Sequence, residues 1–302
     1  MYFKATSWLH PISIIRHSGI GNQAFDTGFQ PTIKLPILQG LIVEEMEVSS
    51  HDGVKVPLSI IHEQGLKRDG LNKAILYGYG AYGISINPNF ISHWMPWLEQ
   101  GGIIAIAHVR GGGEKGADWH IEGLKKNKPN SWKDFIACAE FLIDKKYTSK
   151  KYLSALGSSA GGITIGRAIT EQPDLFKAAV IQVGAMNPLR HEFTNNTSNI
   201  PEYGTISDSL EFTYLLEMDP YHHIDQNSSY PAMLFTAGMN DARLPVWQVG
   251  KMVAGLQNLS SQSSPILLRL DYKGGHFGGG STQMNALWTD VFSFLTWQIG
   301  IP

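Results

Sequence analysis

A serine between glycines is the residue of this chain whose chemistry is most readily inferred from its neighbours. Residues 157–161 read Gly-Ser-Ser-Ala-Gly, with Ser159 at the centre. Residues 152–156 have the apolar pattern of a buried strand, and residues 163–170 have that of a helix. A serine on a sharp strand-to-helix turn is a nucleophile elbow, because small neighbours let the strained chain fold back and expose the hydroxyl. The pattern predicts a nucleophilic serine.

The same five letters also have a simpler interpretation. The chain contains 32 glycines, so a glycine-rich turn that only opens a helix would produce a similar pattern. A nucleophilic serine needs a base that accepts its proton and an acid that orients the base. In hydrolases with this elbow, an aspartate or glutamate and then a histidine follow the serine along the chain. The residues after the elbow must therefore supply that order.

Asp241 and His276 occupy the two expected places. Residues 233–237 predict a buried strand, and Asp241 lies in the turn that follows it, where sites in α/β proteins are found. His276 lies in the glycine-dense run 273–280, between the last predicted strand and the closing helix. The order along the chain predicts a catalytic triad of Ser159, Asp241 and His276. Three unrelated surface loops would not explain this order.

The elements that must position these residues alternate between strands and helices. Residues 41–49 and 54–62 predict a hairpin around a His-Asp-Gly turn. Further strands are predicted at 73–77, 103–109, 152–156, 178–183, 233–237 and 266–270, and further helices at 131–147, with Ser131 as the N-cap, at 245–259 and at 282–298. This alternation predicts an α/β fold of the α/β-hydrolase type, with a mostly parallel central sheet flanked by helices.

Composition and charge argue against several classes of partner. The chain has 302 residues, of which 43% are hydrophobic, and a net charge of -2. This balance indicates neither a nucleic-acid surface nor a polybasic membrane patch. No apolar run has the length of a membrane span, and residues 1–8 lack the apolar core of a signal peptide, so we expect a cytoplasmic protein. The single cysteine, Cys138, lies on the apolar face of a predicted helix and is expected in the core.

Four sequence blocks resemble the catalytic domain of the prolyl oligopeptidase family, and the oligopeptidase B relatives are also similar. The blocks are Leu-Tyr-Gly-Tyr-Gly-Ala-Tyr-Gly at 76–83, Ala-His-Val-Arg-Gly-Gly-Gly-Glu-Lys-Gly at 107–116 with Trp-His at 119–120, the elbow with Arg167 and Gln-Pro-Asp-Leu-Phe at 172–176, and Asn-Asp-Ala-Arg-Leu-Pro at 240–245. The resemblance runs from about Val48 to the C-terminus. It implies a serine-type oligopeptidase that hydrolyses short peptides through an acyl-enzyme.

The resemblance also implies roles for individual residues. By position in the motifs, the Tyr79 hydroxyl and the Ala160 backbone N–H would form the oxyanion hole, where two donors stabilise the developing charge. Arg243 would bind a carbonyl or carboxylate of the peptide through its guanidinium. No cofactor is implied. His222 and His223 are adjacent and point apart on an extended chain, so we predict no metal site.

The specificity segment departs from the family pattern. Proline-selective relatives place a tryptophan before a Tyr-Gly pair, and here Asn199 stands at that position. Tyr203 and Tyr82 would still provide aromatic walls. Glu202 would attract a basic P1 side chain, as acidic residues do in oligopeptidase B relatives, or would be a solvated loop residue. The sequence therefore leaves open whether the protein cleaves after proline.

A second departure concerns domain organisation. Relatives carry a β-propeller that covers the active site, and this chain has no room for one. Residues 1–40 show little regular pattern and are predicted to be a linker or a remnant of the absent propeller, while residues 41–302 form the catalytic domain. The face that a propeller would cover is expected to be apolar and prone to self-association. An esterase on the same fold, or a propeller-less fragment that only binds, remain alternative functions.

Overall fold

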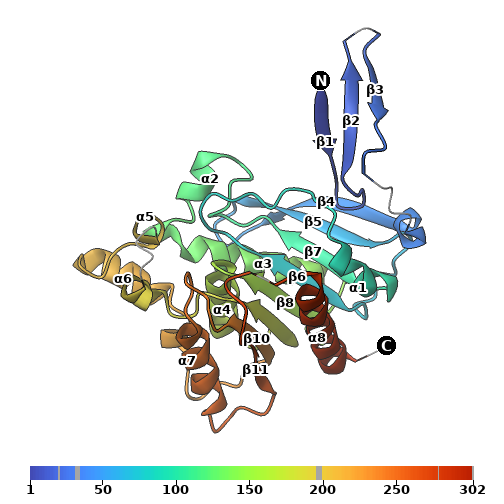
Figure 1. Ribbon diagram of the computed structural model, residues 1–302. Helices are drawn as coiled ribbons and strands as arrows, with labels where there is room; N and C mark the ends of the chain where they lie inside the picture. The colour runs from blue at the N-terminus through green and yellow to red at the C-terminus, as the bar shows by residue number, and fades with distance from the viewer. Residues whose placement is uncertain (20, 31–34, 195–198, 278, 301–302) are drawn as a thin grey trace.

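The computed structural model describes residues 1–19, 21–30, 35–194, 199–277 and 279–300, and in them an eight-stranded sheet forms the centre of an α/β fold (Figure 1). The strands are β4 (Leu41–Ser49), β5 (Lys55–Glu63), β6 (Ala74–Gly78), β7 (Ile103–Ala107), β8 (Leu153–Ser158), β9 (Ala178–Gln182), β10 (Ala232–Gly238) and β11 (Ile266–Asp271). Their order is β11-β10-β9-β8-β6-β7-β5-β4. β5 pairs antiparallel with β4 and β7, and the pairs from β7 to β11 are parallel.

Helices cover both faces of this sheet. The α-helices are α1 (Met95–Glu99), α2 (Ala117–Ile121), α3 (Pro129–Asp144), α4 (Gly161–Glu171), α5 (Ile200–Tyr203), α6 (Ser209–Glu217), α7 (Val246–Gln257) and α8 (Ser281–Ile299). Short 3-10 helices lie at η1 (Pro36–Gln39), η2 (Ser92–Trp94), η3 (Lys125–Asn127), η4 (Pro188–Phe193) and η6 (Tyr221–His223). No described helix is both long and apolar enough to cross a membrane. These elements confirm the predicted α/β-hydrolase type of fold.

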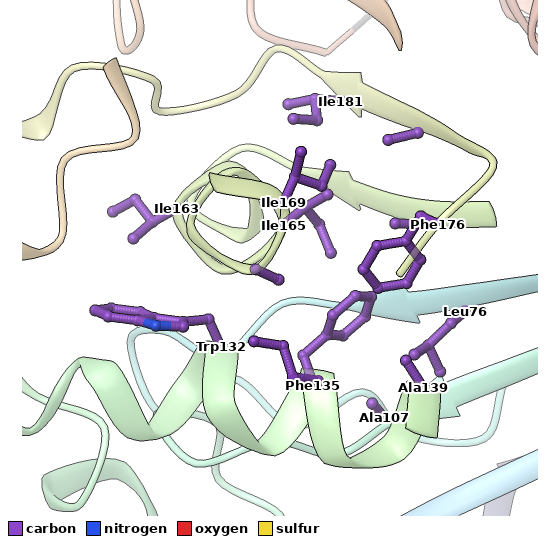
Figure 2. Close-up of a cluster of buried hydrophobic side chains, with 14 of the residues drawn as sticks. Leu76, Ala107, Trp132, Phe135, Ala139, Ile163, Ile165, Ile169, Phe176 and Ile181 are labelled. Carbon is purple, nitrogen blue, oxygen red and sulfur yellow. The ribbon is translucent and has the colours of Figure 1, made fainter. Parts of the chain in front are cut away.

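The two faces of the sheet bury separate hydrophobic clusters, because side chains alternate along each strand. In β7, Ile103 and Ala105 belong to the cluster that includes side chains of α3, α4 and α7, whereas Ile104 and Ile106 belong to the cluster that includes side chains of α1 and α8. Figure 2 shows the first cluster, in which side chains of α3 face those of α4. Central strands buried on both sides explain the near-continuous apolar runs in the sequence.

One close contact in this cluster brings α3 against the end of β6. The rings of Phe135 and Phe176 have centroids 5.8 Å apart (Figure 2). A Cβ atom at Gly78 would lie 2.6 Å from the Phe135 ring, so only glycine fits there. The last residue of β6 is thereby packed tightly against α3. The loop that follows β6 therefore begins at a residue, Gly78, whose position is fixed by packing.

Helix α3 begins earlier than predicted. Pro129 is its first residue and Lys128 its N-cap, so the prediction that Ser131 caps the helix is wrong. Proline suits this first position because its fixed φ matches a helix and its missing N–H is not needed there. Ser131 lies within the first turn, and its hydroxyl donates to the carbonyl of Arg110 at 2.6 Å. Cys138 is fully buried, as predicted.

Residues 2–26 form three strands that the sequence pattern does not predict. β1 (Tyr2–Ala5), β2 (Ser13–Ser18) and β3 (Gln23–Asp26) make an antiparallel sheet that projects from the main body (Figure 1). Most of their side chains are exposed or half-buried, so no apolar alternation marks them in the sequence. Trp8 stacks on Trp94 with ring centroids 6.4 Å apart, which ties this segment to the main body.

Candidate active site

Ser159 lies on a strained turn between β8 and α4. Its φ is +52°, a left-handed conformation that is unfavourable for a non-glycine residue. The turn packs closely on both sides, because a Cβ atom at Gly157 would lie 2.5 Å from Ile165 and one at Gly161 would lie 2.8 Å from the Gly78 carbonyl oxygen. The glycines of the pentapeptide are therefore needed for this geometry, and the serine hydroxyl lies at the tip of the turn.

The structure brings the three predicted triad residues together. The Ser159 hydroxyl lies 2.8 Å from Nε2 of His276, and Nδ1 of the same ring lies 2.8 Å from Oδ2 of Asp241. A carboxylate can only accept, so Nδ1–H donates to Asp241 and leaves Nε2 free to accept the serine proton. The imidazole therefore bridges a hydroxyl and a carboxylate, as a Ser-His-Asp triad requires.

Asp241 is held by the turn that follows β10. Its Oδ1 accepts the backbone N–H groups of Arg243 at 2.8 Å and of Leu244 at 2.9 Å. Burial raises the pKa of this carboxyl group, but the hydrogen bonds from His276 and from these two N–H groups outweigh that effect, so its pKa is below the usual value. The carboxylate is therefore ionised at neutral pH and can stabilise an imidazolium.

The loop that carries His276 lies directly against the end of β10. A Cβ atom at Gly238 would lie 2.3 Å from the Gly275 carbonyl oxygen, so the two segments approach as closely as glycine allows. Asn240 donates its backbone N–H to the Gly274 carbonyl at 3.0 Å. These contacts fix the histidine loop next to the aspartate turn. The His276 side chain is 9% exposed, so the base is shielded from bulk water on most sides.

Ser159 opens onto a pocket of about 610 Å³. It is lined by Tyr79, Tyr82, Ile84, Ser159, Ala160, Ala185, Asn199, Tyr203, Ala242, Arg243, Leu244 and His276. Both predicted oxyanion donors lie on this lining, with Tyr79 directly after β6 and Ala160 directly after the serine. Burial raises the pKa of the Tyr79 hydroxyl well above its usual range, and a hydrogen bond with Ser159 only partly offsets this effect. Tyr79 is therefore a protonated donor at neutral pH.

The predicted specificity residues Tyr82, Tyr203 and Asn199 share one wall of the pocket. The two tyrosine rings meet edge to face, with centroids 5.6 Å apart. The Tyr82 hydroxyl donates to Oδ1 of Asn199 at 2.7 Å. Arg243 is exposed at the pocket rim, and its guanidinium forms no ion pair with the described part of the chain. The wall is aromatic, and the nearby cation is available to a ligand.

Glu202 is placed differently from either prediction. It is 3% exposed, so it is not a solvated loop residue. Its carboxylate accepts the backbone N–H of Tyr82 at 2.8 Å and the ring N–H of His120 at 2.8 Å. It is not among the residues that line the pocket. The reason is that α5 turns this side chain inward, behind the aromatic wall.

Three further residues support the site from separate helices, and of these the resemblance marks only His120. Thr164 of α4 donates its hydroxyl to the Tyr79 carbonyl at 2.7 Å. His120 and Lys128 contact Glu202 from α2 and from the start of α3. Their spacing along the chain follows no motif, because they meet only through the packing of separate helices. Across the described ranges no group of three or more His, Cys, Asp or Glu side chains is arranged to hold a metal ion.

Comparison with known proteins gives one consistent family. A model described as the prolyl oligopeptidase family matches residues 88–301. The chain is 36% identical over 305 residues to a prolyl endopeptidase of Elizabethkingia meningoseptica, covering all of this chain and 43% of that protein. It is 34% identical over 242 residues to protease 2 of Moraxella lacunata, covering 78% of this chain and 34% of that protein.

Solved structures agree with this result. A structure from a study of two prolyl endopeptidases superposes with a TM-score of 0.94 at 35% identity, over 100% of this chain and 44% of that chain. Oligopeptidase B from Leishmania major superposes with a TM-score of 0.87 at 28% identity, over 99% of this chain and 42% of that chain. This chain spans less than half the length of these relatives.

The lowered pKa of Asp241 predicts a contribution to stability with a defined pH range. The pKa in the folded state lies below the ordinary value of 3.8, so the carboxylate stabilises the fold above about pH 4, and this contribution is lost as the pH falls through the folded-state pKa. For Asp241→Asn we expect the free energy of unfolding to fall by about 1.5–3 kcal/mol at pH 7. Urea unfolding of both proteins along a pH series measures the difference. A difference that stays constant from neutral to strongly acidic pH would contradict an ionised, hydrogen-bonded carboxylate.

Proposed function

The chain belongs to the prolyl oligopeptidase family, and we propose that it hydrolyses short peptides through an acyl-enzyme formed on Ser159. The observation that carries this proposal is the unbroken chain of hydrogen bonds from the serine hydroxyl through His276 to Asp241, 2.8 Å at each step. The order of these residues along the sequence and the α/β-hydrolase fold support the same chemistry. The relatives named prolyl endopeptidase and the oligopeptidase B structure support a peptide as substrate.

The geometry supports the following reaction. His276 accepts the Ser159 proton at Nε2 while the serine oxygen attacks the peptide carbonyl, and Asp241 stabilises the imidazolium. The carbonyl oxygen becomes negatively charged and is stabilised by the Tyr79 hydroxyl and the Ala160 N–H. His276 then gives its proton to the leaving amine. A water molecule, activated by the same imidazole, attacks the acyl-enzyme and releases the acid, which restores Ser159.

The pocket supports an apolar P1 residue, including proline, in preference to a basic one. Its wall is formed by the paired rings of Tyr82 and Tyr203, and the carboxylate of Glu202 is engaged behind that wall. A basic P1 side chain would therefore meet aromatic faces without a free anion. At the rim, Arg243 is exposed, and its guanidinium is suited to bind a carbonyl or the terminal carboxylate of a short peptide.

The domain boundary near residue 40 and association through a propeller-facing surface remain predictions. The strands β1–β3 lie apart from the sheet that begins at β4 (Figure 1), which supports a boundary in this region. Exposed aromatic residues occur in this N-terminal segment, among them Tyr2, Phe3, Phe25 and Phe29. They would be the first candidates for contacts between copies of the chain.

Ser159→Ala should lower kcat on a short chromogenic peptide by about six orders of magnitude, because removing the nucleophile of a triad eliminates the covalent route. The assay compares the variant with wild type at saturating peptide. Ser158→Ala is the matched control, because it removes the neighbouring hydroxyl, which lies outside the triad. Equal rates for Ser159→Ala and wild type would refute the assigned nucleophile. Wild-type cleavage of esters without cleavage of amides would favour an esterase.

Tyr79→Phe should lower kcat by about a hundredfold and change KM far less, because the hydroxyl is worth most when the oxyanion forms. Steady-state kinetics on the same peptide separates the two constants. Tyr2→Phe, which removes an exposed hydroxyl far along the chain from the site, is the control. A loss confined to KM would instead assign Tyr79 to ground-state binding.

A panel of fluorogenic peptides that differ only at P1 tests the specificity. We expect kcat/KM for proline and alanine at P1 to exceed that for arginine by about tenfold or more, since Glu202 is engaged by the Tyr82 N–H and by His120 and leaves an arginine side chain without an anionic partner. Initial rates at low substrate concentration give the ratio. A preference for arginine would show that Glu202 leaves its partners on binding and faces the substrate.

A further inference from the structure

The loop that carries the oxyanion tyrosine has an unusual backbone that needs external support. We name residues 79–83 the oxyanion loop. Gly80 has a φ of +75°, Tyr82 of +58° and Gly83 of +61°, so left-handed conformations recur within five residues. Thr164 holds the first carbonyl of the loop at 2.7 Å, and the N–H of Gly83 donates to the Gly111 carbonyl at 3.0 Å. The middle of the loop is held by a buried charged pair.

Lys128 supplies the cation of this pair. Its side chain is fully buried, and its ammonium donates a short hydrogen bond to the carbonyl of Gly80. The same ammonium lies 3.9 Å from Oε1 of Glu202 and 5.8 Å from the ring centroid of Tyr203. A buried ammonium is unfavourable unless it is paired and hydrogen-bonded. Its position at the N-cap of α3 places it directly behind the oxyanion loop.

Glu202 supplies the anion and contacts the other side of the same loop. Its Oε1 accepts the backbone N–H of Tyr82 at 2.8 Å, two residues beyond the carbonyl that Lys128 holds. Its Oε2 accepts the ring N–H of His120 at 2.8 Å. One carboxylate therefore links the oxyanion loop to α2 and, through Lys128, to α3. Because Glu202 lies in α5 beside Tyr203, the same contact links the loop to the aromatic wall of the pocket.

We propose that Lys128 and Glu202 are positioning residues that clamp the Gly80 carbonyl and the Tyr82 N–H, and thereby fix the Tyr79 hydroxyl where the oxyanion forms. The inference rests on the proposed peptidase function, because it assigns a task within that reaction. A donor stabilises a transition state only when it is held within a few tenths of an ångström of the developing charge. The clamp provides this rigidity from behind the loop, without touching the substrate.

The charge on Lys128 makes the clamp sensitive to pH. Burial lowers the pKa of Lys128 to about 8, although the nearby Glu202 carboxylate raises it. Around it lie His120 of α2, Glu202 and Tyr203 of α5 and Tyr82 of the loop, while the adjacent Lys125 of η3 pairs with Glu211. Burial raises the pKa of Tyr82 to about 12 and that of Tyr203 well above its usual value, so both stay neutral near pH 8. Loss of the Lys128 proton therefore weakens the hold on the Gly80 carbonyl.

A double-mutant cycle tests whether Lys128 acts through Tyr79. We expect Lys128→Met to lower kcat on a short peptide about tenfold or more with a much smaller change in KM. In the Tyr79→Phe background the same change should lower kcat by less than about threefold, because the positioned hydroxyl is already absent. Lys126→Met is the matched control: Lys126 is exposed, lies two residues away and should leave both constants unchanged.

The pH profile provides a second readout, which a merely structural role would not change. Wild-type kcat should fall as the pH rises through about 8. Glu202→Gln keeps the size of the side chain and an acceptor for the Tyr82 N–H but removes the anion that raises the pKa of Lys128, so the fall should begin at a lower pH. If Lys128→Met does not fold, Glu202→Gln still tests the positioning role through this shift in the pH profile. Lys128→Arg keeps its charge at all these pH values and should retain activity above pH 8, where the wild type loses it.

The outcomes separate the inference from the function on which it rests. The positioning role is overturned if the kcat losses of Lys128→Met and Tyr79→Phe multiply in the double mutant. It is also overturned if the alkaline fall in kcat begins at the same pH in Glu202→Gln as in wild type. In either case the proposed function stands as long as wild type shows Ser159-dependent cleavage. A wild-type chain without Ser159-dependent cleavage overturns the proposed function and this inference together. If the kcat losses of Lys128→Met and Tyr79→Phe do not multiply, and the alkaline fall in kcat begins at a lower pH in Glu202→Gln, the results support the proposed function and the positioning role.

Discussion

The left-handed backbone of Ser159 is the constraint on which the rest of the site depends. A non-glycine residue in this conformation costs about 1–3 kcal/mol, and it persists because its surroundings hold it. Its N–H donates to the Gln182 carbonyl at 2.9 Å, and its carbonyl accepts the N–H groups of Gly162 and Ala185, each at 2.9 Å. The turn is thus pinned to the end of β9 and to the first turn of α4. The hydroxyl is directed toward His276, whose Nε2 lies 2.8 Å away.

The order of the strands in the sheet brings Ser159 close to Asp241 and His276. β8, β10 and β11 are parallel strands whose carboxyl ends lie at the same edge, with β9 between β8 and β10. The serine, the aspartate and the histidine follow those three strands, so residues 117 positions apart in sequence meet at 2.8 Å. The close approach that Gly238 permits then brings the last two loops into contact. The contacts among Ser159, Asp241 and His276 follow from the parallel topology and from glycine at a few defined positions.

The sequence predicted those parts of the protein that have a local or ordered signature. Sequence alone predicts the elbow, the strand pattern and the order of Ser159, Asp241 and His276. Each of these features depends on neighbours along the chain or on the order of the elements. The clamp formed by Lys128 and Glu202 could not be predicted from the sequence, since the two residues lie on separate helices and meet only when those helices pack together. Glu202 is predicted from the sequence either to attract a basic P1 side chain or to lie in solvent, because nothing in its neighbours shows which way α5 faces.

The positions of the N-terminal strands could not be predicted for a different reason, although the resemblance implies strands of a propeller in this segment. Exposed strands such as β1–β3 bury too little for apolar alternation to develop. The start of α3 differs, because it does carry a local signal. Pro129 suits the first helical position, whereas Ser131, which resembles a cap, lies two positions later and bonds to Arg110.

The geometry implies that His276 activates Ser159 within the folded chain. The most direct measurement is the reaction of the folded protein with a fluorophosphonate, followed by peptide mapping and by rates for wild type and His276→Ala. We expect one adduct on Ser159 in wild type, formed at least about a thousandfold faster than in His276→Ala. No adduct on Ser159 in folded wild type, or equal rates in the two proteins, would contradict it.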